Sequence, residues 1–471
     1  MSPVNDRVAD FPEKKNSSIG YLMNSLLLRS TIVAALGGLL FGFDTAVISG
    51  TTDALTGIFN LTSMSLGFTV ASALIGTIIG SIAVGWPSDR FGRRNTLVVL
   101  AVFYFVSALG SAMAWSLMSF VIFRFLGGLA VGGASVVSPM YIAEISPARL
   151  RGRLVAVTQF NIVLGILLAY FSNYLISSSN AFGDAAWRWM FGVEAVPAAV
   201  FFILLFANPL SPRWLMGRKR VADARSILEK LGADTGGVDR EIRAIQDSLD
   251  LEHHRIAERF YTRKYAKPIL LAFLIAMFNQ LSGINALMYY APHIFRMAGA
   301  AESDAMLQAV AVGGTNLIFT VIAMSVIDHF GRRRLMLIGS VGYIISLATV
   351  AVSFYTFGTQ FTPAGGMVVL AGLLVFIASH AFGQGAVIWV FISEIFPNRV
   401  RARGQALGSF THWFMAAAVS WTFPVIADIS GGHAFTIFAC MMVLQLLFVI
   451  FMMPETRGVP LEEIQKRLGI E

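Results

Sequence analysis

Charged residues are scarce in this chain of 471 residues: Asp, Glu, Lys and Arg together make up 13% of it. A water-soluble domain usually carries about 25%. Cysteine is scarcer still, because Cys440 is the single one, and an intrachain disulfide is therefore excluded. Because the chain has few charged groups for water to hydrate, we expect it to lie in a lipid environment.

Several motifs of enzymes and ATP-driven proteins are also missing. The sequence has no Gly-x-x-x-x-Gly-Lys-Ser/Thr phosphate-binding loop, so it gives no support for direct use of ATP. It has no Cys/His cluster with the spacing of a zinc site, and no Ser-centred hydrolase elbow on a strand. We therefore expect a protein that is not an enzyme and that holds neither a metal nor a cofactor.

Apolar sequence is abundant, at 56% of all residues. It is gathered into long runs, and an α-helix needs about 20 such residues to cross the hydrocarbon of a bilayer. An open sheet cannot cross lipid, so we predict an all-α membrane protein. Its twelve predicted spans are 30–50, 66–87, 95–115, 117–141, 153–177, 188–207, 268–291, 305–327, 335–357, 366–393, 404–426 and 433–453.

A polar stretch divides these spans into two groups of six. Within it, 220–232 and 238–250 have the pattern of short amphipathic surface helices. We predict an N-terminal segment, a six-helix bundle, a linker, a second six-helix bundle and a C-terminal tail. Their ranges are 1–29, 30–207, 208–267, 268–453 and 454–471.

The basic residues are distributed unevenly around the spans. Of the 35 Lys and Arg, all except Arg124, Arg188 and Arg296 lie before the first span, in the linker, in the tail or in every second loop. Positively charged loops stay in the cytoplasm, so both termini are predicted to be cytoplasmic. The net charge of +8 then reflects topology and not binding of nucleic acid. The short loops and tails favour a bacterial inner membrane.

The two halves of the chain repeat the same loop motifs. Asp-x-Phe-Gly-Arg follows the second span and recurs after the eighth, and Glu and Arg spaced seven residues apart follow the fourth span and recur after the tenth. Two six-span halves of like orientation imply a pseudo-twofold axis along the membrane normal, with a site where the halves meet. The repeated charged residues are Asp89, Arg93, Glu144 and Arg151 in the first half and Asp328, Arg332, Glu394 and Arg401 in the second.

We expect these charges to form a cytoplasmic salt-bridge network. The helix dipole disfavours a carboxylate at a helix C-terminus, so Glu144 and Glu394 need basic partners. The clusters are expected to bridge the halves while the outside is open and to part when the inside opens. The expected pairings are Glu144 with Arg93 and Arg151, and Glu394 with Arg332 and Arg401.

The paired motifs resemble the major facilitator superfamily, and within it the sugar porter family. The run from Gln280 to Pro292 resembles the family's signature in the seventh span, and Pro139–Glu144 and Pro454–Gly458 match two further motifs. The resemblance covers about residues 25–465. It implies two pseudo-symmetric six-helix bundles that give alternating access to a monosaccharide site, and we expect the chain to function as a monomer.

Two residues of opposite charge stand inside predicted spans, Asp44 in 30–50 and Arg124 in 117–141. Alone in hydrocarbon each would cost a few kcal/mol, so we expect them to face the bundle interior and to pair. One hypothesis is a static ion pair that fixes helix packing. The other is a proton switch, because burial disfavours a charged carboxylate whereas a nearby guanidinium favours it. In having aspartate at this position the chain resembles bacterial xylose–proton symporters, whereas facilitative glucose transporters have asparagine there. Glu194 receives no role.

A sugar site needs groups that both donate and accept hydrogen bonds, which amides do, and aromatic faces for the ring. For each amide, a helix–helix hydrogen bond is the alternative interpretation. Tyr289 and Tyr290 either gate the site from outside, as in relatives, or belong to an interfacial aromatic belt. By resemblance, the sugar-binding residues are Gln159, Asn279, Gln280, Asn285, Asn316, Gln384, Trp389, His412 and Trp413.

The sequence thus predicts a symporter whose partners are a small sugar, a proton and the lipid bilayer. The chain departs from the family pattern at Asn279, Ile166 and His412, and these departures leave the choice of sugar open. Three alternatives also stay open: a facilitative uniporter of the same fold, a porter for a polyol, inositol or an organic ion, and a sugar sensor that does not transport.

Overall fold

The computed structural model describes residues 24–147, 149–179, 181–232, 235–253, 259–358, 360–397 and 399–470. Within these ranges the chain forms helices, and no strand occurs there. Twelve segments are long and apolar enough to cross a membrane. Each of them overlaps one of the twelve predicted spans, so the predicted all-α membrane fold is confirmed.

The first six spans form an N-terminal bundle. They are α1 (Ser25–Val47) with η1 (Ile48–Gly50), α3 (Ser63–Ala83), α5 (Arg93–Ala112), α6 (Leu117–Ile145), α7 (Arg151–Ser178), and α8 (Ala186–Gly192) with α9 (Ala195–Leu205). Three short elements connect them, namely α2 (Thr52–Phe59), α4 (Gly85–Phe91) and η2 (Gly183–Ala185).

The last six spans form a C-terminal bundle. They are α13 (Ala266–Leu281) with α14 (Ile284–Met297), α15 (Glu302–Phe330), α16 (Arg332–Phe357), α17 (Pro363–Phe382) with α18 (Gln384–Ile395), α19 (Arg401–Ile429) and α20 (Gly431–Phe451). Between the bundles lie α10 (Pro212–Gly217), α11 (Val221–Lys230), α12 (Thr235–His253) and η3 (Arg263–Tyr265), and α21 (Leu461–Leu468) follows the last span.

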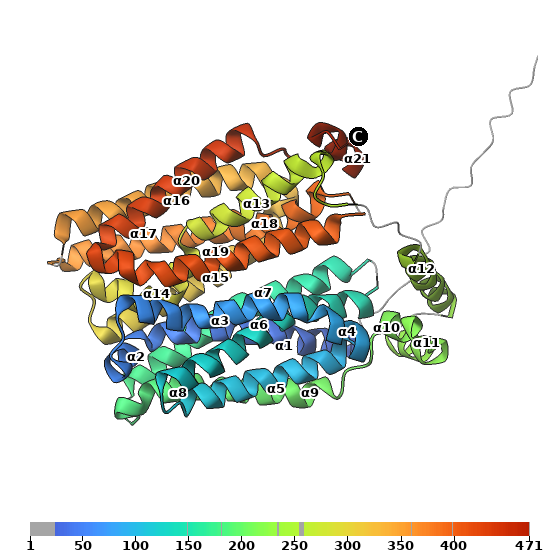
Figure 1. Cartoon of the computed structure of the whole chain (residues 1–471), viewed down its shortest axis with the longest axis horizontal. Coiled ribbons are helices and arrows are strands. Elements are labelled where there is room, and N and C mark those ends of the chain that lie inside the picture. Colours follow the sequence, from blue (N-terminus) through green and yellow to red (C-terminus); the bar gives the residue numbers. More distant parts are fainter. Residues whose placement is uncertain are drawn as a thin grey trace, which may run out of the picture.

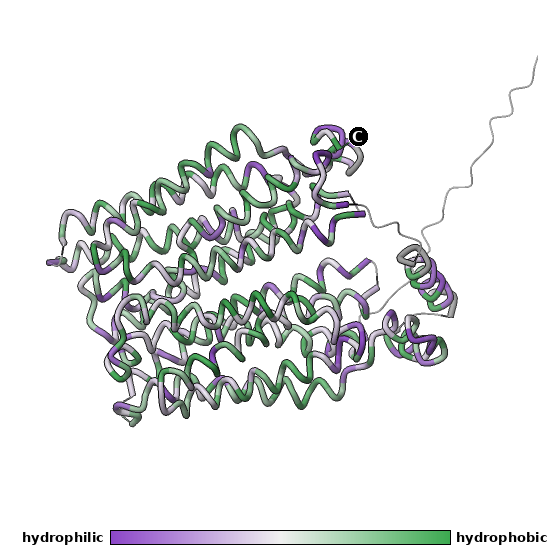
Figure 2. The backbone as a smooth tube through the Cα atoms, viewed as in Figure 1, coloured by the Kyte–Doolittle hydropathy of each residue, from purple (hydrophilic) through white to green (hydrophobic). Residues whose placement is uncertain are grey.

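The two bundles lie side by side with their helices roughly parallel (Figure 1). The short helices α4, α10, α11, α12 and α21 gather at one end, which we call the linker face; α2 and η2 lie at the opposite end, the distal face. Figure 2 shows apolar residues along the spans and hydrophilic ones mostly at their ends. This distribution is what a bilayer requires of a protein that crosses it.

Small residues let the helices of the N-terminal bundle approach closely. A Cβ added to Gly42 of α1 would lie 1.8 Å from the carbonyl oxygen of Ile162 on α7. A Cβ on Gly128 of α6 would lie 1.9 Å from the carbonyl oxygen of Ala73 on α3. Since lipid tails are as apolar as side chains, such close van der Waals packing is a main source of stability between membrane helices.

Three spans are broken, and candidate site residues lie beside each break. Gly283 separates α13 from α14 with a φ of +86°, a conformation that favours glycine. Gly383 separates α17 from α18, and Glu194 separates α8 from α9. Irregular backbone at membrane depth is tolerated where protein buries it or where it lines a cavity. The breaks therefore bring polar groups into the interior of the bundles.

Candidate transport site

Asp44 of α1 and Arg124 of α6 meet inside the N-terminal bundle. Arg124 Nη1 donates to Asp44 Oδ1 at 2.6 Å, and Nη2 donates to Oδ2 at 3.2 Å and to the Asp44 carbonyl oxygen at 3.1 Å. Asp44 is 3% exposed and Arg124 is 1% exposed. Two such charges can be buried together because the fork of the guanidinium matches the carboxylate.

A second carboxylate, which the sequence analysis left without a role, belongs to this group. Glu194 is buried, and its Oε1 has no hydrogen-bond partner within the described ranges. It lies within electrostatic reach of both Asp44 and Arg124. Two carboxylates and one guanidinium leave an excess negative charge in a buried site, and a bound proton would cancel that charge. The signal in the sequence was an acidic residue inside an apolar run.

Amide side chains form the core of a polar chain in the C-terminal bundle. Asn285 donates to Gln280 Oε1 at 2.9 Å, and Gln280 Nε2 donates to Asn279 Oδ1 at 2.9 Å. Asn279 Nδ2 in turn donates to Gln384 Oε1 at 3.4 Å, across from α13 to α18. The break at Gly283 makes this chain continuous, because it places Asn285 of α14 beside the last turn of α13.

The chain of amides continues behind the site. Gln384 Nε2 donates to Gln445 Oε1 of α20 at 2.7 Å, and Gln445 Nε2 donates to Ser340 Oγ of α16 at 2.8 Å. Gln384 and Gln445 are fully buried. Since both ends of its amide have protein partners, Gln384 acts on the site through Asn279. Gln445 was missed by sequence reasoning, because a single glutamine in an apolar span also fits a simple helix–helix hydrogen bond.

Aromatic rings line the other side of these amides. The ring of His412 lies 5.1 Å from that of Trp389 and 4.8 Å from that of Trp413, both measured between centroids. Both ring nitrogens of His412 are 3.2 Å from Gln280 Nε2. Phe41 of α1, which the sequence analysis did not consider, lies 5.6 Å from Trp413. The aromatic wall therefore spans both bundles.

Two predicted amides lie elsewhere on the interface between the bundles. Gln159 is on α7 and Asn316 is on α15, and these two helices pack against each other. Neither side chain makes a hydrogen bond within the described part of the chain, whereas Gln280 and Asn285 do. Gln159 and Asn316 thus have their hydrogen-bonding groups available to a ligand.

Tyr289 and Tyr290 are buried, so they do not form an interfacial belt. Tyr290 Oη donates to the carbonyl oxygen of Ser420 at 3.0 Å, and its non-helical backbone kinks α14. Tyr289 lies near Thr45, the neighbour of Asp44, and within electrostatic reach of Asp44 and Arg124. A residue of the C-terminal bundle thus lies beside the ion pair of the N-terminal bundle.

The acidic clusters at the linker face stay within their own bundles. Arg93 Nε donates to Glu144 Oε1 at 2.9 Å, and Ser211 donates to the other oxygen of Glu144. Arg93 also pairs with Asp89 at 2.9 Å. The second half repeats the arrangement, with Arg332 Nη2 at 2.9 Å from Glu394 Oε1. The side chain of Asp328 lies outside the described residues.

Two of the expected pairings are wrong in this conformer. Arg151 pairs with Glu241 of α12 at 3.9 Å and donates to the carbonyl oxygen of Ala143, and Arg401 donates to the carbonyl oxygen of Phe396 at 3.4 Å. Glu144 and Glu394 each already have an arginine and a hydroxyl partner. Arg151 begins α7 and binds a carbonyl group near the end of α6. Arg401 begins α19 and binds a carbonyl group at the end of α18.

The bundles touch at the distal face and separate at the linker face. Asp53 of α2 forms an ion pair with Arg296 of α14 and lies 3.3 Å from His293 Nδ1, and Ser63 of α3 donates to Asp428 of α19. At the linker face a cavity of about 690 Å³ lies between α3 and α19. Two bundles with a polar interface, closed at one face, define a transporter that works by alternating access.

Comparison with known proteins agrees with this class. The family described as "Sugar (and other) transporter" matches residues 30–468, and the chain belongs to this family. It is 41% identical to the D-xylose-proton symporter of Escherichia coli strain K12, over 94% of this chain and 96% of the relative. It is 35% identical to the arabinose-proton symporter of Bacillus subtilis strain 168, over 97% of both chains.

A solved structure matches the fold. The inward open conformation of the xylose transporter XylE from E. coli aligns with a TM-score of 0.83 at 39% identity. The alignment covers 94% of this chain and 99% of that one. The family is one of transporters, and the chain is a multi-pass membrane protein of the major facilitator fold.

Proposed function

We propose that this protein is a proton-coupled symporter of a monosaccharide, either a pentose or a hexose. The observation that carries the proposal is the buried pair of Asp44 and Arg124, which lies next to Tyr289 of the opposite bundle. The names of the relatives, a xylose–proton and an arabinose–proton symporter, support coupling to a proton.

Asp44 carries the proton, and its distance from Arg124 controls loading and release. Paired as it is here, the carboxylate keeps its charge because the guanidinium compensates it. When α14 moves away from α1 at the distal face, Tyr289 uncovers the pair and water reaches Asp44. A proton then replaces Arg124 as the partner of the carboxylate. Closure of the distal face restores the ion pair and expels the proton toward the linker face.

The sugar binds between the amides and the indole rings. Gln280 and Asn285 present donors and acceptors from the C-terminal bundle, and Gln159 and Asn316 supply amides that make no hydrogen bond with the described residues. Trp389 and Trp413 offer ring faces to the apolar side of the sugar. Tyr289 and Tyr290 close over the site from the distal side.

Coupling to one proton sets the sugar gradient that the protein can sustain. One elementary charge that crosses 100 mV releases about 2.3 kcal/mol, which sustains roughly a fiftyfold sugar gradient. A uniporter with a static ion pair would sustain none. The two mechanisms therefore differ in accumulation and not in the binding of sugar.

The protein is placed in the plasma membrane as a monomer, with the linker face and both termini in the cytoplasm. The linker face carries the arginines of α4, α10, α11 and α21 and those at the N-terminal ends of α7, α16 and α19. The positive-inside rule places such a face in the cytoplasm. The structure is then open to the cytoplasm, with the polar stretch 208–267 as the linker between two bundles.

Replacing Asp44 with Asn tests the proposal. In proteoliposomes the wild-type protein should accumulate its sugar when a proton gradient is imposed, and D44N should lose accumulation at least tenfold. D44N should still exchange labelled sugar for unlabelled sugar, because the amides and indoles are intact. The measurement is uptake over a panel of pentoses, hexoses and polyols, with and without the gradient. Equal wild-type uptake in both conditions would identify a uniporter.

A further inference from the structure

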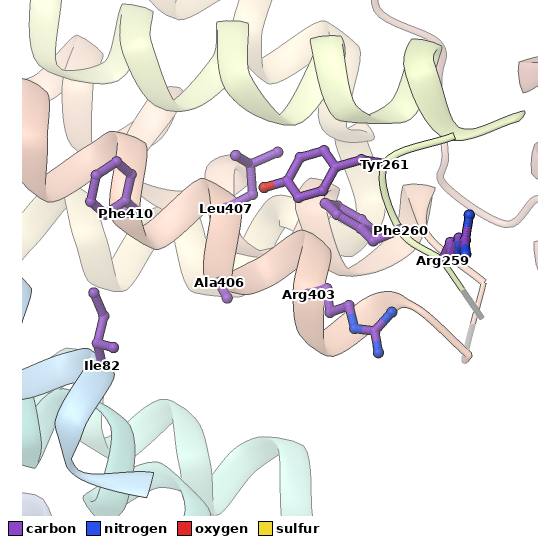
Figure 3. A pocket seen from close by; sticks show the side chains of 8 residues that line it. All are labelled: Ile82, Arg259, Phe260, Tyr261, Arg403, Ala406, Leu407 and Phe410. Atoms are coloured by element: carbon purple, nitrogen blue, oxygen red, sulfur yellow. The ribbon is translucent and has the colours of Figure 1, made fainter. Parts of the chain in front are cut away.

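A crevice opens between the bundles at the linker face (Figure 3). Helices α3 and α19 touch near the distal face, where a Cβ on Gly67 would lie 2.0 Å from the carbonyl oxygen of Trp421. Toward the linker face they diverge, and a cavity of about 690 Å³ separates Ile82 of α3 from Phe410 of α19. The chain that leads into α13 closes one side of it, through Tyr261.

The walls of the crevice are apolar and accessible. Ile82 is 67% exposed, Phe410 is 47% exposed and Tyr261 is 79% exposed. Ile82 forms the α3 side of this open crevice, and Tyr261 and Phe410 lie on its other side.

Two guanidinium groups lie at one end of the same crevice. Arg259 precedes η3 and Arg403 lies in the first turn of α19, so both stand where spans leave the membrane. Figure 3 shows them at the linker end, with Phe410 and Ile82 further inside. Guanidinium groups bind phosphate oxygens in bidentate geometry.

We propose that this crevice binds one anionic phospholipid from the leaflet at the linker face. Its phosphate lies between Arg259 and Arg403, and one acyl chain runs along Phe410 and Ile82. Basic pockets between membrane helices are suited to anionic head groups, and the apolar walls favour an amphiphile over a soluble phosphate. The inference rests on the alternating-access part of the proposed function, because the crevice requires a conformer open at the linker face.

A lipid bound in the crevice keeps the linker-face ends of α3 and α19 apart. Closing the linker face brings the ends of α3 and α19 together and expels the acyl chain. A ligand that binds one of two conformers shifts the population toward that conformer by its differential affinity. Anionic lipid therefore stabilises the conformer open at the linker face and slows the return step of the transport cycle.

Native mass spectrometry of the purified protein tests the binding. After exchange into equal amounts of phosphatidylglycerol and phosphatidylcholine, the wild-type protein should retain one phosphatidylglycerol. The double variant Arg259→Gln and Arg403→Gln should retain it at least fivefold less often. The matched control removes two exposed charges of the linker face that do not line the crevice, Lys219→Gln and Lys466→Gln, and should bind as the wild type does.

A second variant separates the acyl chain from the charges. Ala406→Trp fills the crevice and keeps both arginines, and it should lose the lipid to a similar degree. If the double arginine variant does not fold, Ala406→Trp alone tests whether the lipid binds in the crevice. Equal retention in wild type and both crevice variants would overturn the proposal, and so would equal loss in the lysine control.

Soluble glycerol phosphate serves as the competitor. At a concentration equal to that of the lipid it should not displace phosphatidylglycerol, because it lacks the acyl chain. Displacement would show a site for free anions and would overturn the proposal. Since none of these measurements involves transport, their failure leaves the proposed symport untouched, and loss of symport in D44N does not affect them.

Discussion

At the scale of single residues, the site depends on the balance of three buried charges. Arg124 compensates Asp44 directly, and Glu194 adds a second negative charge within electrostatic reach. The sequence predicted the first two from their positions inside spans. Glu194 obeys the same rule, but the sequence does not say which residue faces it. Its place beside Asp44 and Arg124 is decided by the break between α8 and α9.

Glu194→Gln should shift the pH profile of uptake to the acid side. Removing one of the two buried carboxylates removes the excess negative charge that a bound proton would cancel, so loading needs a higher proton concentration. We expect the half-maximum of proton-driven uptake to move by about one pH unit, with exchange of sugar retained. The measurement is initial uptake in proteoliposomes between pH 5 and 8. The control Glu229→Gln, on exposed α11, should leave the profile unchanged. An unshifted profile in Glu194→Gln would show that Glu194 does not contribute to proton loading.

Gln445→Leu should weaken sugar binding from a distance. It leaves Gln384 Nε2 without its acceptor and removes the donor to Ser340, which still donates to Met336; an unsatisfied buried polar group costs about 1–3 kcal/mol. Asn279 then loses its support from Gln384, so the KM for sugar should rise several-fold while the maximal rate changes little. Uptake kinetics and the thermal unfolding midpoint measure both effects. Gln360→Leu on an exposed loop is the control. A lower midpoint with an unchanged KM would limit Gln445 to a structural role.

At the scale of elements, the break between α13 and α14 positions most of the sugar site. Ser282 donates to the carbonyl oxygen of Asn279 at 2.6 Å and also accepts from the Ile284 backbone N–H at 3.3 Å, so one hydroxyl joins both helices. Gly283 turns the chain with positive φ. A continuous helix would move Asn285 away from Gln280 and interrupt the chain of amides.

Gly283→Ala should therefore impair both folding and transport. The positive φ costs about 1–2 kcal/mol for a residue with a Cβ. The added Cβ would also lie 2.5 Å from the ring of Phe438. We expect a lower thermal unfolding midpoint and at least a tenfold loss of exchange activity. Gly314→Ala in α15 is the matched control, since its Cβ would meet no atom within 4 Å. Equal activity of both variants would contradict the importance of the break.

At the scale of the whole molecule, contacts at the distal face hold the bundles closed there. Asp53 joins Arg296 and His293, Ser63 joins Asp428, and Phe68 packs against Trp421 with 5.2 Å between ring centroids. Each contact crosses from one bundle to the other. At the linker face the ion pairs of Glu144 and Glu394 stay within their own bundles. The closed and open ends of the molecule follow from this difference.

Asp53→Asn should shift the population toward the conformer open at the distal face. Half-exposed ion pairs contribute about 0.2–1 kcal/mol, which corresponds to a change of up to roughly fivefold in the ratio of conformers. The readout is maleimide labelling of Ser49→Cys, placed in a protein that also carries Cys440→Ser. Ser49 is 1% exposed in this conformer, and its labelling rate should rise two- to fivefold. Asp184→Asn, another acidic residue of the distal face, should leave the rate unchanged; the same rise there would point to a general charge effect.

Hydrophobic run length and charge placement were enough to predict the all-α fold, the twelve spans and the paired halves, because a bilayer allows few ways to satisfy the backbone. They also located Asp44 and Arg124, since a charge inside a span is costly wherever the helices lie. Tertiary packing decided the rest. Glu194, Gln445, Phe41 and Asp53 acquire their partners from segments distant in the chain, and Glu194 lies at the break between α8 and α9. Sequence spacing does not specify such contacts, because they depend on how each helix is rotated against its neighbours.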